Sequence, residues 1–273
     1  MTRLFFYSLA ILASSALTAH SATITITTAD GNGADAEVLG HNANTNRGHT
    51  GWIDVGFKTT ATAYYGKAYV RFELPNNIGT ITHAELRLFR SNPGGFSENR
   101  TFNIYGLLEA SDYGTGRLDE EWAENTITWN NAPGNSTATT SGTNANLLDA
   151  NTLFLYSHTR NIQTTGSFVS NDTGAKTTAL IDFLTNEDTN GLVTFILRAD
   201  ANLSNNSTFT TKEYADWISP NTPTAGWHGP VLYLEYEPLE NSEIPEPATL
   251  SLLAIASVVL LPMAYARRRR KLA

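Results

Sequence analysis

Several carboxylates gather around one tryptophan in the middle of the chain. The run Asp119-Glu120-Glu121-Trp122-Ala123-Glu124 holds four acidic side chains within six residues. Two carboxylates on opposite sides of a glycosidic bond can hydrolyse it. Closeness in sequence does not place them across a cleft, so the run alone does not predict catalysis. No Gly-x-Ser-x-Gly turn is present, and because the chain has no cysteine a thiolate nucleophile is excluded.

Oxygen-bearing side chains suited to a hard cation occur early in the chain. Asp30, Asn32 and Asp35 offer three of them within six residues. Carboxylate, amide and backbone oxygens are the ligands that Ca²⁺ takes, although the spacing is not that of an EF-hand. We therefore expect either a polar turn or a structural calcium site. His41 and His49 flank the next loop, and their separation is not typical of a metal site.

Aromatic and cationic side chains allow a different chemistry, which is stacking against sugar rings and hydrogen bonding to hydroxyl groups. The following rings lie in or beside expected loops: Trp52, Tyr64, Tyr65, Tyr113, Trp217 and Trp227. Large aromatic residues are more often buried than exposed, and we expect Trp122 and Trp129 in the core. The expected binding face combines outward residues of adjacent strands with one loop residue: Tyr69, Arg71, Arg87 and Trp52.

Segments of alternating polar and apolar residues must position these side chains. Such alternation, typical of half-buried strands, occurs in residues 67–74, 81–90, 101–108, 192–197 and 231–237. Residues 23–28 supply a first strand, and 177–186 could form a short helix. Within 67–74, Val70, Phe72 and Leu74 share the face that we expect inside. Short strands between loops rich in Gly, Asn, Ser and Thr predict an all-β sandwich or barrel.

The composition narrows the classes of partner. Without its two ends, the chain carries 12 basic and 25 acidic residues, a net charge of about −13. Nucleic acid is an unsuitable partner for such a surface, because phosphate binding needs a basic stripe. Neutral glycans, or anionic glycans bridged by Ca²⁺, suit it better. No disulfide is possible, so stability must come from an ordinary core.

Both ends of the chain have the composition of targeting segments. Met1-Thr2-Arg3, an apolar run and then small residues predict a signal peptide over residues 1–21, with cleavage after Ser21 or after Ala19. Residues 248–266 carry no charge and are long enough for a single transmembrane helix. The basic tail, residues 267–273, is expected on the cytoplasmic side of the membrane.

The C-terminal segment has three parts in a fixed order. Pro245-Glu246-Pro247 precedes the uncharged segment, and Arg267-Arg268-Arg269-Arg270 follows it. This order resembles the PEP-CTERM sorting signal of Gram-negative bacteria. The resemblance implies recognition by an exosortase-type membrane enzyme, cleavage near the Pro-Glu-Pro motif, and transfer of residues 22–237 to the cell surface. A permanent membrane anchor is the simpler alternative, and in both cases residues 238–247 form an acidic tether.

Three segments of the remaining chain carry a second resemblance. They are residues 69–75, 81–88 and 122–134, of which Trp122, Glu124 and the run Thr126-Ile127-Thr128-Trp129-Asn130 are the most specific. Together they resemble the DNRLRE domain family, a secreted jelly-roll β-sandwich that is in part classified as carbohydrate-binding. The resemblance implies structural roles for four residues: Phe72, Trp122, Glu124 and Trp129. Glu124 would then accept hydrogen bonds rather than act in catalysis.

We therefore expect an exported, surface-sorted β-sandwich that binds extracellular polysaccharide without catalysis. The alternative is a structural matrix or adhesion protein with no specific glycan ligand, and a polysaccharide-degrading enzyme is the least favoured reading. The expected partners are an exosortase-type enzyme, the membrane before processing, and extracellular polysaccharide. No cofactor is expected apart from a structural Ca²⁺ ion.

Overall fold

The computed structural model describes residues 21–58, 64–76, 78–90, 99–109, 113–137, 147–148, 150–161, 166–186, 190–200, 207–214 and 229–239. The chain divides into a unit that ends at Glu237 and a second unit, Pro238–Ala273, of which only Pro238 and Leu239 are described. The predicted signal peptide, except its last residue, and the predicted transmembrane segment lie outside the described residues. Within the described ranges, no helix is long and apolar enough to cross a bilayer.

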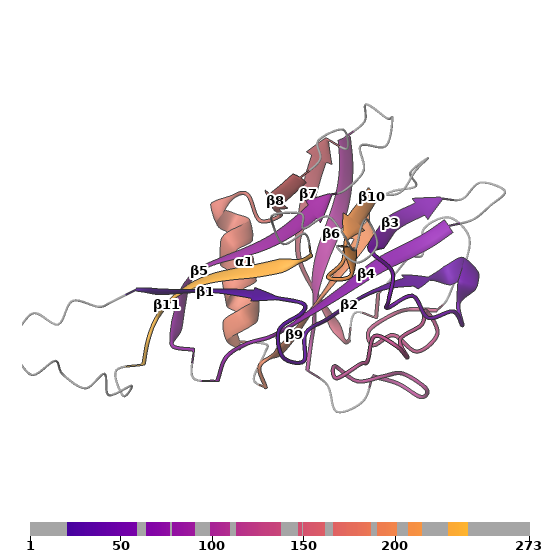
Figure 1. Ribbon diagram of the computed structural model, residues 1–273, viewed down its shortest axis with the longest axis horizontal. Helices are drawn as coiled ribbons and strands as arrows, with labels where there is room; N and C mark the ends of the chain where they lie inside the picture. The colour runs from indigo at the N-terminus through magenta and orange to yellow at the C-terminus, as the bar shows by residue number, and fades with distance from the viewer. Residues whose placement is uncertain are drawn as a thin grey trace, which may run out of the picture. The chain divides into compact units, whose positions relative to one another are not determined.

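Two antiparallel sheets form the first unit, which confirms the predicted β-sandwich (Figure 1). The smaller sheet has the strand order β1 (Ala22–Thr27), β11 (Val231–Glu237), β5 (Thr80–Arg90) and β8 (Gly166–Val169). Its central pairing joins the first, last and fifth strands of the chain. Ala22 lies opposite Tyr236, and Leu234 lies opposite Ala84.

The larger sheet has seven strands. Six of them follow the order β10 (Ser207–Thr210), β3 (Trp52–Lys58), β4 (Tyr64–Glu73), β9 (Leu192–Ala199), β6 (Asn99–Leu107) and β7 (Thr152–Asn161). The seventh, β2 (Ala34–Leu39), pairs with β4, where Ala34 lies opposite Arg71. A 3₁₀ turn, η1 (Gly40–Asn42), follows β2, and the helix α1 (Gly174–Asn186) connects β8 with β9.

The main core lies between the two sheets. Val70 and Phe72 of β4 and Leu74, which follows it, are buried there, as their alternation predicted, and so are the alternate residues Ala84, Leu86 and Leu88 of β5. Helix α1 adds three apolar side chains to this core: Leu180, Phe183 and Leu184. The ring of Phe183 packs so closely on Gly106 of β6 that a Cβ at that position would collide with it. This contact explains why a strand carries glycine under the helix.

A second core covers the opposite, outward face of the larger sheet. It is formed by residues 113–137, which we call the roof segment, together with β2. Trp122 and Trp129 of the roof segment are each 1 % exposed, as predicted, and pack on a cluster that includes Tyr69 and Ile196. The rings of Trp122 and Tyr69 meet edge to face with centroids 6.0 Å apart. The larger sheet is therefore buried on both faces beneath this segment.

Candidate functional site

The outward residues of β4 do not face solvent, which corrects the prediction that Tyr69 and Arg71 belong to an open binding face. Tyr69 is fully buried, and its hydroxyl donates to the carbonyl of Pro133 at 3.0 Å. Arg71 is 6 % exposed. The physical reason is the roof segment, which lies over this face and leaves no room for a ligand.

Arg71 anchors the roof segment to the sheet. Its Nη1 donates to the carbonyls of Glu120 and Trp122, both at 2.8 Å, and its Nε donates to the carbonyl of Asn32 at 2.9 Å. The guanidinium also lies 5.0 Å from the centre of a Trp122 ring. Burial lowers the pKa of Arg71, and nearby carboxylates, Glu124 first, oppose that shift. Its donors are directed at backbone carbonyls, as expected of a structural residue.

Lys67, four residues before Arg71 on β4, performs a similar task. Lys67 is fully buried, donates from Nζ to Oδ1 of Asn135 at 2.5 Å, and lies 4.4 Å from the ring centre of Trp129. Burial lowers the pKa of Lys67 well below its usual value, and the charges of Arg198 and Arg117 lower it further. Lys67 and Arg71 thus both hold the roof segment on the sheet.

Arg87 lies on β5 of the smaller sheet, whereas Arg71 lies on β4 of the larger sheet. The prediction that Arg71 and Arg87 share a surface is therefore wrong. Trp52, at the start of β3, is half-buried and pairs with Thr210 of β10 in the larger sheet. Of the four residues predicted for the binding face, Arg87 is the one that the structure places on an accessible, polar sheet surface.

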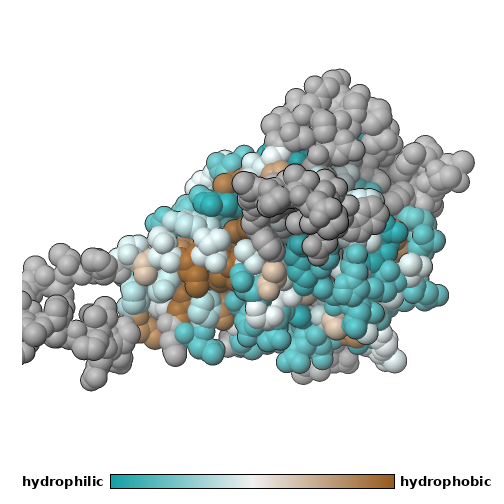
Figure 2. Space-filling model, viewed as in Figure 1, coloured by the Kyte–Doolittle hydropathy of each residue, from teal (hydrophilic) through white to brown (hydrophobic). Residues whose placement is uncertain are grey.

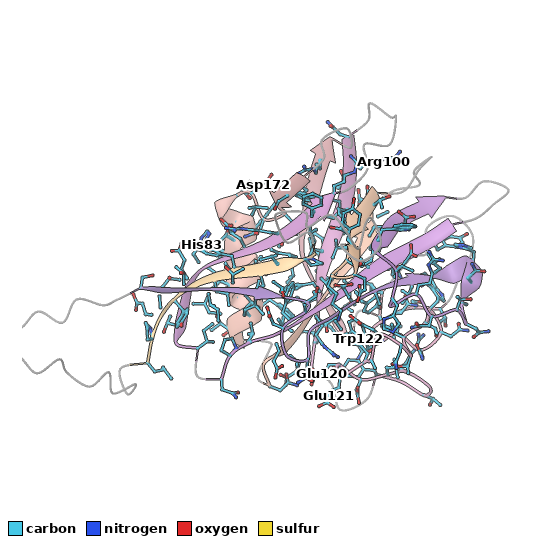
Figure 3. The ribbon with its side chains drawn as sticks, viewed as in Figure 1. His83, Arg100, Glu120, Glu121, Trp122 and Asp172 are labelled. Atoms are coloured by element: carbon cyan, nitrogen blue, oxygen red, sulfur yellow. The ribbon has the colours of Figure 1, made fainter. Side chains whose placement is uncertain are left out.

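That surface, which we call the open face, is the outward side of β5 and β11. It consists of His83, Glu85 and Arg87 from β5 with Tyr233 and Glu235 from β11. Tyr233 lies opposite Glu85, and Glu235 lies opposite His83. The side chains of Arg87, His83 and Glu85 are 37 %, 36 % and 22 % exposed. Figure 3 shows His83 on β5 close to β11.

The side chains of the open face form a connected network. Glu85 accepts from Arg87 Nη2 at 2.5 Å and contacts Nε2 of His83 at 3.2 Å. The guanidinium of Arg87 lies 4.6 Å from the ring centre of Tyr233, and the His83 ring meets the same ring edge to face at 6.3 Å. Tyr233 donates its hydroxyl proton to Glu235 Oε1 at 3.0 Å. These contacts fix the orientation of the Tyr233 ring beside the guanidinium of Arg87 and the imidazole of His83.

The electrostatics of the open face are balanced. Partial burial acts to raise the pKa of Glu85, but hydrogen bonds from Arg87 and His83 and their charges outweigh it and lower the pKa. The hydrogen bond to Glu235 raises the pKa of Tyr233. At neutral pH the face thus offers ionised acceptors, guanidinium donors and a neutral phenol. Such a mixture of donors, acceptors and an aromatic ring matches a hydroxyl-rich ligand better than a purely ionic one.

Alternation in the sequence already indicated where these side chains lie. In residues 231–237, Leu232 and Leu234 alternate with Tyr233 and Glu235, so the latter two belong on the outward face. The sequence does not reveal that β11 pairs with β5, since the two strands are about 150 residues apart. This non-local pairing is what brings Tyr233 to Arg87.

The acidic run around Trp122 does not form a catalytic pair. Asp119 Oδ1 accepts from the backbone NH of Glu121, Glu120 accepts from the side-chain amide of Asn190, and Glu121 is exposed. Glu124 accepts at Oε1 from the backbone NH of Asp35 at 2.7 Å. Figure 3 shows Glu120 and Glu121 at the margin of the molecule, with Trp122 further inside. These carboxylates fix backbone segments and do not face one another across a cleft.

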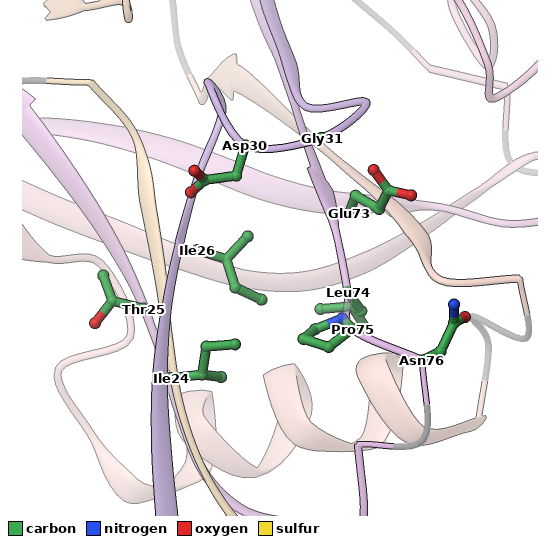
Figure 4. A pocket seen from close by; sticks show the side chains of 9 residues that line it. All are labelled: Ile24, Thr25, Ile26, Asp30, Gly31, Glu73, Leu74, Pro75 and Asn76. Carbon is green, nitrogen blue, oxygen red and sulfur yellow. The ribbon is translucent and has the colours of Figure 1, made fainter.

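A hollow of about 280 Å³ lies between β1 and the end of β4 (Figure 4). Its walls include Ile24, Ile26 and Leu74, and Asp30 and Glu73 lie at one end. On the face shown in Figure 2, apolar surface is concentrated in the region of β1 and α1. Both carboxylates are already engaged in the β1–β2 turn, because Asp30 accepts from Thr27 and Glu73 accepts from the backbone NH of Asn32. Neither carboxylate is therefore free to orient a sugar in the hollow.

The residues predicted as calcium ligands make separate contacts. Asp30 closes the turn after β1, and Asn32 uses its backbone NH and carbonyl to bind Glu73 and Arg71. Asp35 is fully buried in β2, where Oδ2 accepts from the hydroxyl of Thr28 at 2.5 Å. The expected polar turn is thus present, with Asp35 directed away from it.

Comparison with known proteins gives one assignment. A search of curated proteins found no significant match. The model of carbohydrate-binding module family 96 matches residues 26–196, which is more than half of the chain. The matched range contains strands of both sheets, the roof segment and the β5 half of the open face. The chain belongs to carbohydrate-binding module family 96.

Proposed function

We propose that the protein binds extracellular polysaccharide through the open face and carries out no catalysis itself. The observation that carries this proposal is the match to a carbohydrate-binding module over residues 26–196. The open face supports it because an aromatic ring, a guanidinium and two carboxylates lie together on an accessible sheet surface. Tyr233 would contact the apolar face of a sugar, and Arg87, Glu85 and Glu235 would bind its hydroxyl groups.

The charge balance of the open face favours a particular class of ligand. Arg87 is paired with Glu85, so the guanidinium of this face is not left to attract an anionic chain by charge alone. We infer that the ligand is a neutral glycan, or an anionic glycan whose charge is bridged by Ca²⁺. A glycan array probed with residues 22–239, with and without Ca²⁺, tests this class. Absence of binding under both conditions would favour the alternative of a structural matrix or adhesion protein.

Two substitutions locate the binding surface. Tyr233→Ala and Arg87→Ala should each weaken binding of the glycan found on the array at least about tenfold, since each removes a central contact. Phe154→Ala is the matched control, because Phe154 is another aromatic residue, is 52 % exposed and lies on β7 of the larger sheet. Isothermal titration calorimetry gives the affinities. Loss of binding in Phe154→Ala with retention in Tyr233→Ala would move the site to the larger sheet.

The two ends of the chain lead to a second part of the proposal. We propose that residues 1–21 direct export, and that residues 245–273 act as a sorting signal that an exosortase-type enzyme cleaves near Pro245-Glu246-Pro247. The supports are the compositions of the two segments and the resemblance to PEP-CTERM signals. Intact-mass analysis of surface material should find a protein that lacks residues 248–273. A mass that retains the arginine cluster would identify the tail as a permanent anchor.

A further inference from the structure

Side chains from four distant parts of the sequence meet beside β2. Asp35 belongs to β2, His49 precedes β3, Glu124 is in the roof segment, and Glu213 follows β10. The ligand atoms of His49, Glu124 and Glu213 all lie within 4.8 Å of one another. Since metal–ligand distances are about 2.0–2.6 Å, two ligands of one ion lie up to about 4–5 Å apart. The three side chains are therefore spaced as ligands of a single ion are.

Asp35 adds a buried carboxylate oxygen that lacks a hydrogen-bond donor. Its backbone NH donates to Glu124, and its Oδ2 accepts from Thr28 and from the backbone NH of Lys212 at 3.1 Å. Oδ1 of Asp35 and Oε2 of Glu213 are buried without a hydrogen-bond partner. Buried carboxylate oxygens are costly unless a donor or a cation compensates them. Two uncompensated oxygens at one place indicate a missing positive ligand.

The charges at this place do not balance. Lys212 Nζ lies 2.5 Å from Glu124 Oε1 and 3.4 Å from the carbonyl oxygens of Thr28 and Gly33. One ammonium thus faces three carboxylates, so two negative charges remain when all of them are ionised. A divalent cation would neutralise the remaining charge and fill the gap between the oxygens.

We propose that His49, Glu124 and Glu213 bind one divalent metal ion, beside the buried carboxylate of Asp35. Carboxylate oxygens together with an imidazole nitrogen suit Mn²⁺ or Zn²⁺, whereas Ca²⁺ takes oxygen ligands and would not use His49. The ion replaces the Lys212 ammonium at Glu124. It ties the loop before β3, the roof segment and the chain after β10 together, and its function is to hold the roof segment in place.

The sequence concealed this site for two reasons. His49 and Glu213 are 164 residues apart, so no ligand spacing is visible in either loop. Glu124 also stands in a run of acidic residues, where the sequence indicated a structural role for it but no metal. Gly48 permits the approach, because a Cβ there would collide with the backbone carbonyl of Glu124.

Thermal unfolding of the full-length chain, after treatment with a chelator, tests the proposal. Mn²⁺ or Zn²⁺ at saturating concentration should raise the Tm of the wild type by about 5 °C or more. Glu213→Gln should lose most of that shift, and the control Glu121→Gln, an exposed acid of the same roof segment, should retain it. The proposal is overturned if neither ion raises the Tm of the wild type, or if Glu213→Gln responds as the wild type does.

Two further variants should change the affinity for metal in opposite directions. Their results do not depend on whether Glu213→Gln folds stably. Lys212→Met removes the competing ammonium, so calorimetry should show at least about threefold tighter binding of Mn²⁺ or Zn²⁺. His49→Gln, at an exposed position, should weaken the binding of these two ions at least about tenfold and leave any response to Ca²⁺ unchanged. Unaltered Mn²⁺ and Zn²⁺ affinity in His49→Gln would contradict its assignment as a ligand.

Discussion

The outward faces of the two sheets carry similar residues in different surroundings. On β4 of the larger sheet these residues are Lys67, Tyr69 and Arg71, and on β5 of the smaller sheet they are His83, Glu85 and Arg87. The first set is buried beneath the roof segment, and the second is partly exposed. The identity of the hydrogen-bond partners distinguishes the two faces. Arg71 donates to backbone carbonyls of the roof segment, whereas Arg87 is paired with the side chain of Glu85.

This difference shows how an anchor can be told from a ligand-binding residue. An arginine that satisfies carbonyl groups of a loop cannot leave them without exposing or orphaning those groups. An arginine that is paired with a carboxylate at the surface can exchange partners when a ligand arrives, since both groups remain hydrated. Alternation in a strand predicts which side chains point outward, but not which outward face the chain later covers.

Removal of the two arginines gives the largest expected contrast. Arg71→Ala should lower the free energy of unfolding by about 3 kcal/mol or more, because one buried and two partly buried carbonyls lose their donor. Arg87→Ala should lower it by less than about 1 kcal/mol, as is usual for exposed ion pairs. Urea titration followed by circular dichroism measures both values. Equal losses in the two variants would mean that the roof segment does not depend on Arg71.

Aromatic residues sharpen the same comparison with a smaller effect. Trp122→Phe removes the donation from Nε1 to Thr194 Oγ1 at 3.2 Å and leaves a gap in the second core, so a loss of about 2 kcal/mol is expected. Tyr233→Phe removes the hydrogen bond to Glu235 on the open face and should cost less than about 0.5 kcal/mol. Should Tyr233→Phe prove the more damaging change, the open face would itself be structural.

The smallest expected effect concerns the pH dependence contributed by Lys67. Because burial lowers its pKa in the folded state, the unfolded chain binds the proton more tightly. Between the lowered pKa and the ordinary value of 10.5, stability therefore rises with pH. Lys67→Met removes this contribution, so the wild type should gain more stability than the variant between pH 7 and about 9.5. Urea midpoints at several pH values measure the difference.

If the stability of the wild type and that of Lys67→Met changed with pH in parallel, this account of Lys67 would be contradicted. Groups that titrate in both proteins contribute equally to the two curves, so their effects cancel in the difference. At pH 7 Lys67→Met should itself be destabilising, because the buried Asn135 Oδ1 loses its donor, so the test compares only the change of stability with pH.

Much of the fold followed from the alternation of apolar residues. The strands around Phe72, Leu86 and Leu234 were predicted with the correct inward faces, and so was the short helix. β2 was not predicted, because its alternating residues are mostly alanine, aspartate and glutamate, which are depleted in strands. β7 was not predicted either. A bulge in β7 itself disturbs the period, so that Leu153 and Phe154 are exposed while Leu155 and Tyr156 are buried.

The candidate sites could be predicted less well than the strands. Arg87 was identified as an outward residue, but its partner Tyr233 depends on a pairing between strands that are far apart in sequence. Asp35 was predicted with Asp30 and Asn32 as a possible calcium ligand, but its side chain contacts Thr28 and the backbone NH of Lys212. Its surroundings come from the roof segment and from the residues after β10, which local sequence patterns do not connect with it.

The place of β11 in the middle of the smaller sheet affects how the chain can fold. β1 is the first strand and β5 the fifth, yet both pair with β11, the last seven residues of the unit. In a nascent chain that ends before Val231, β1 and β5 would lack the strand that lies between them and pairs with both. The apolar side chains of Ile24 on β1 and Leu86 on β5 would then be exposed. Pairings that close so long a loop form slowly. Folding should therefore wait for the end of synthesis, and chains truncated before β11 should be prone to aggregation.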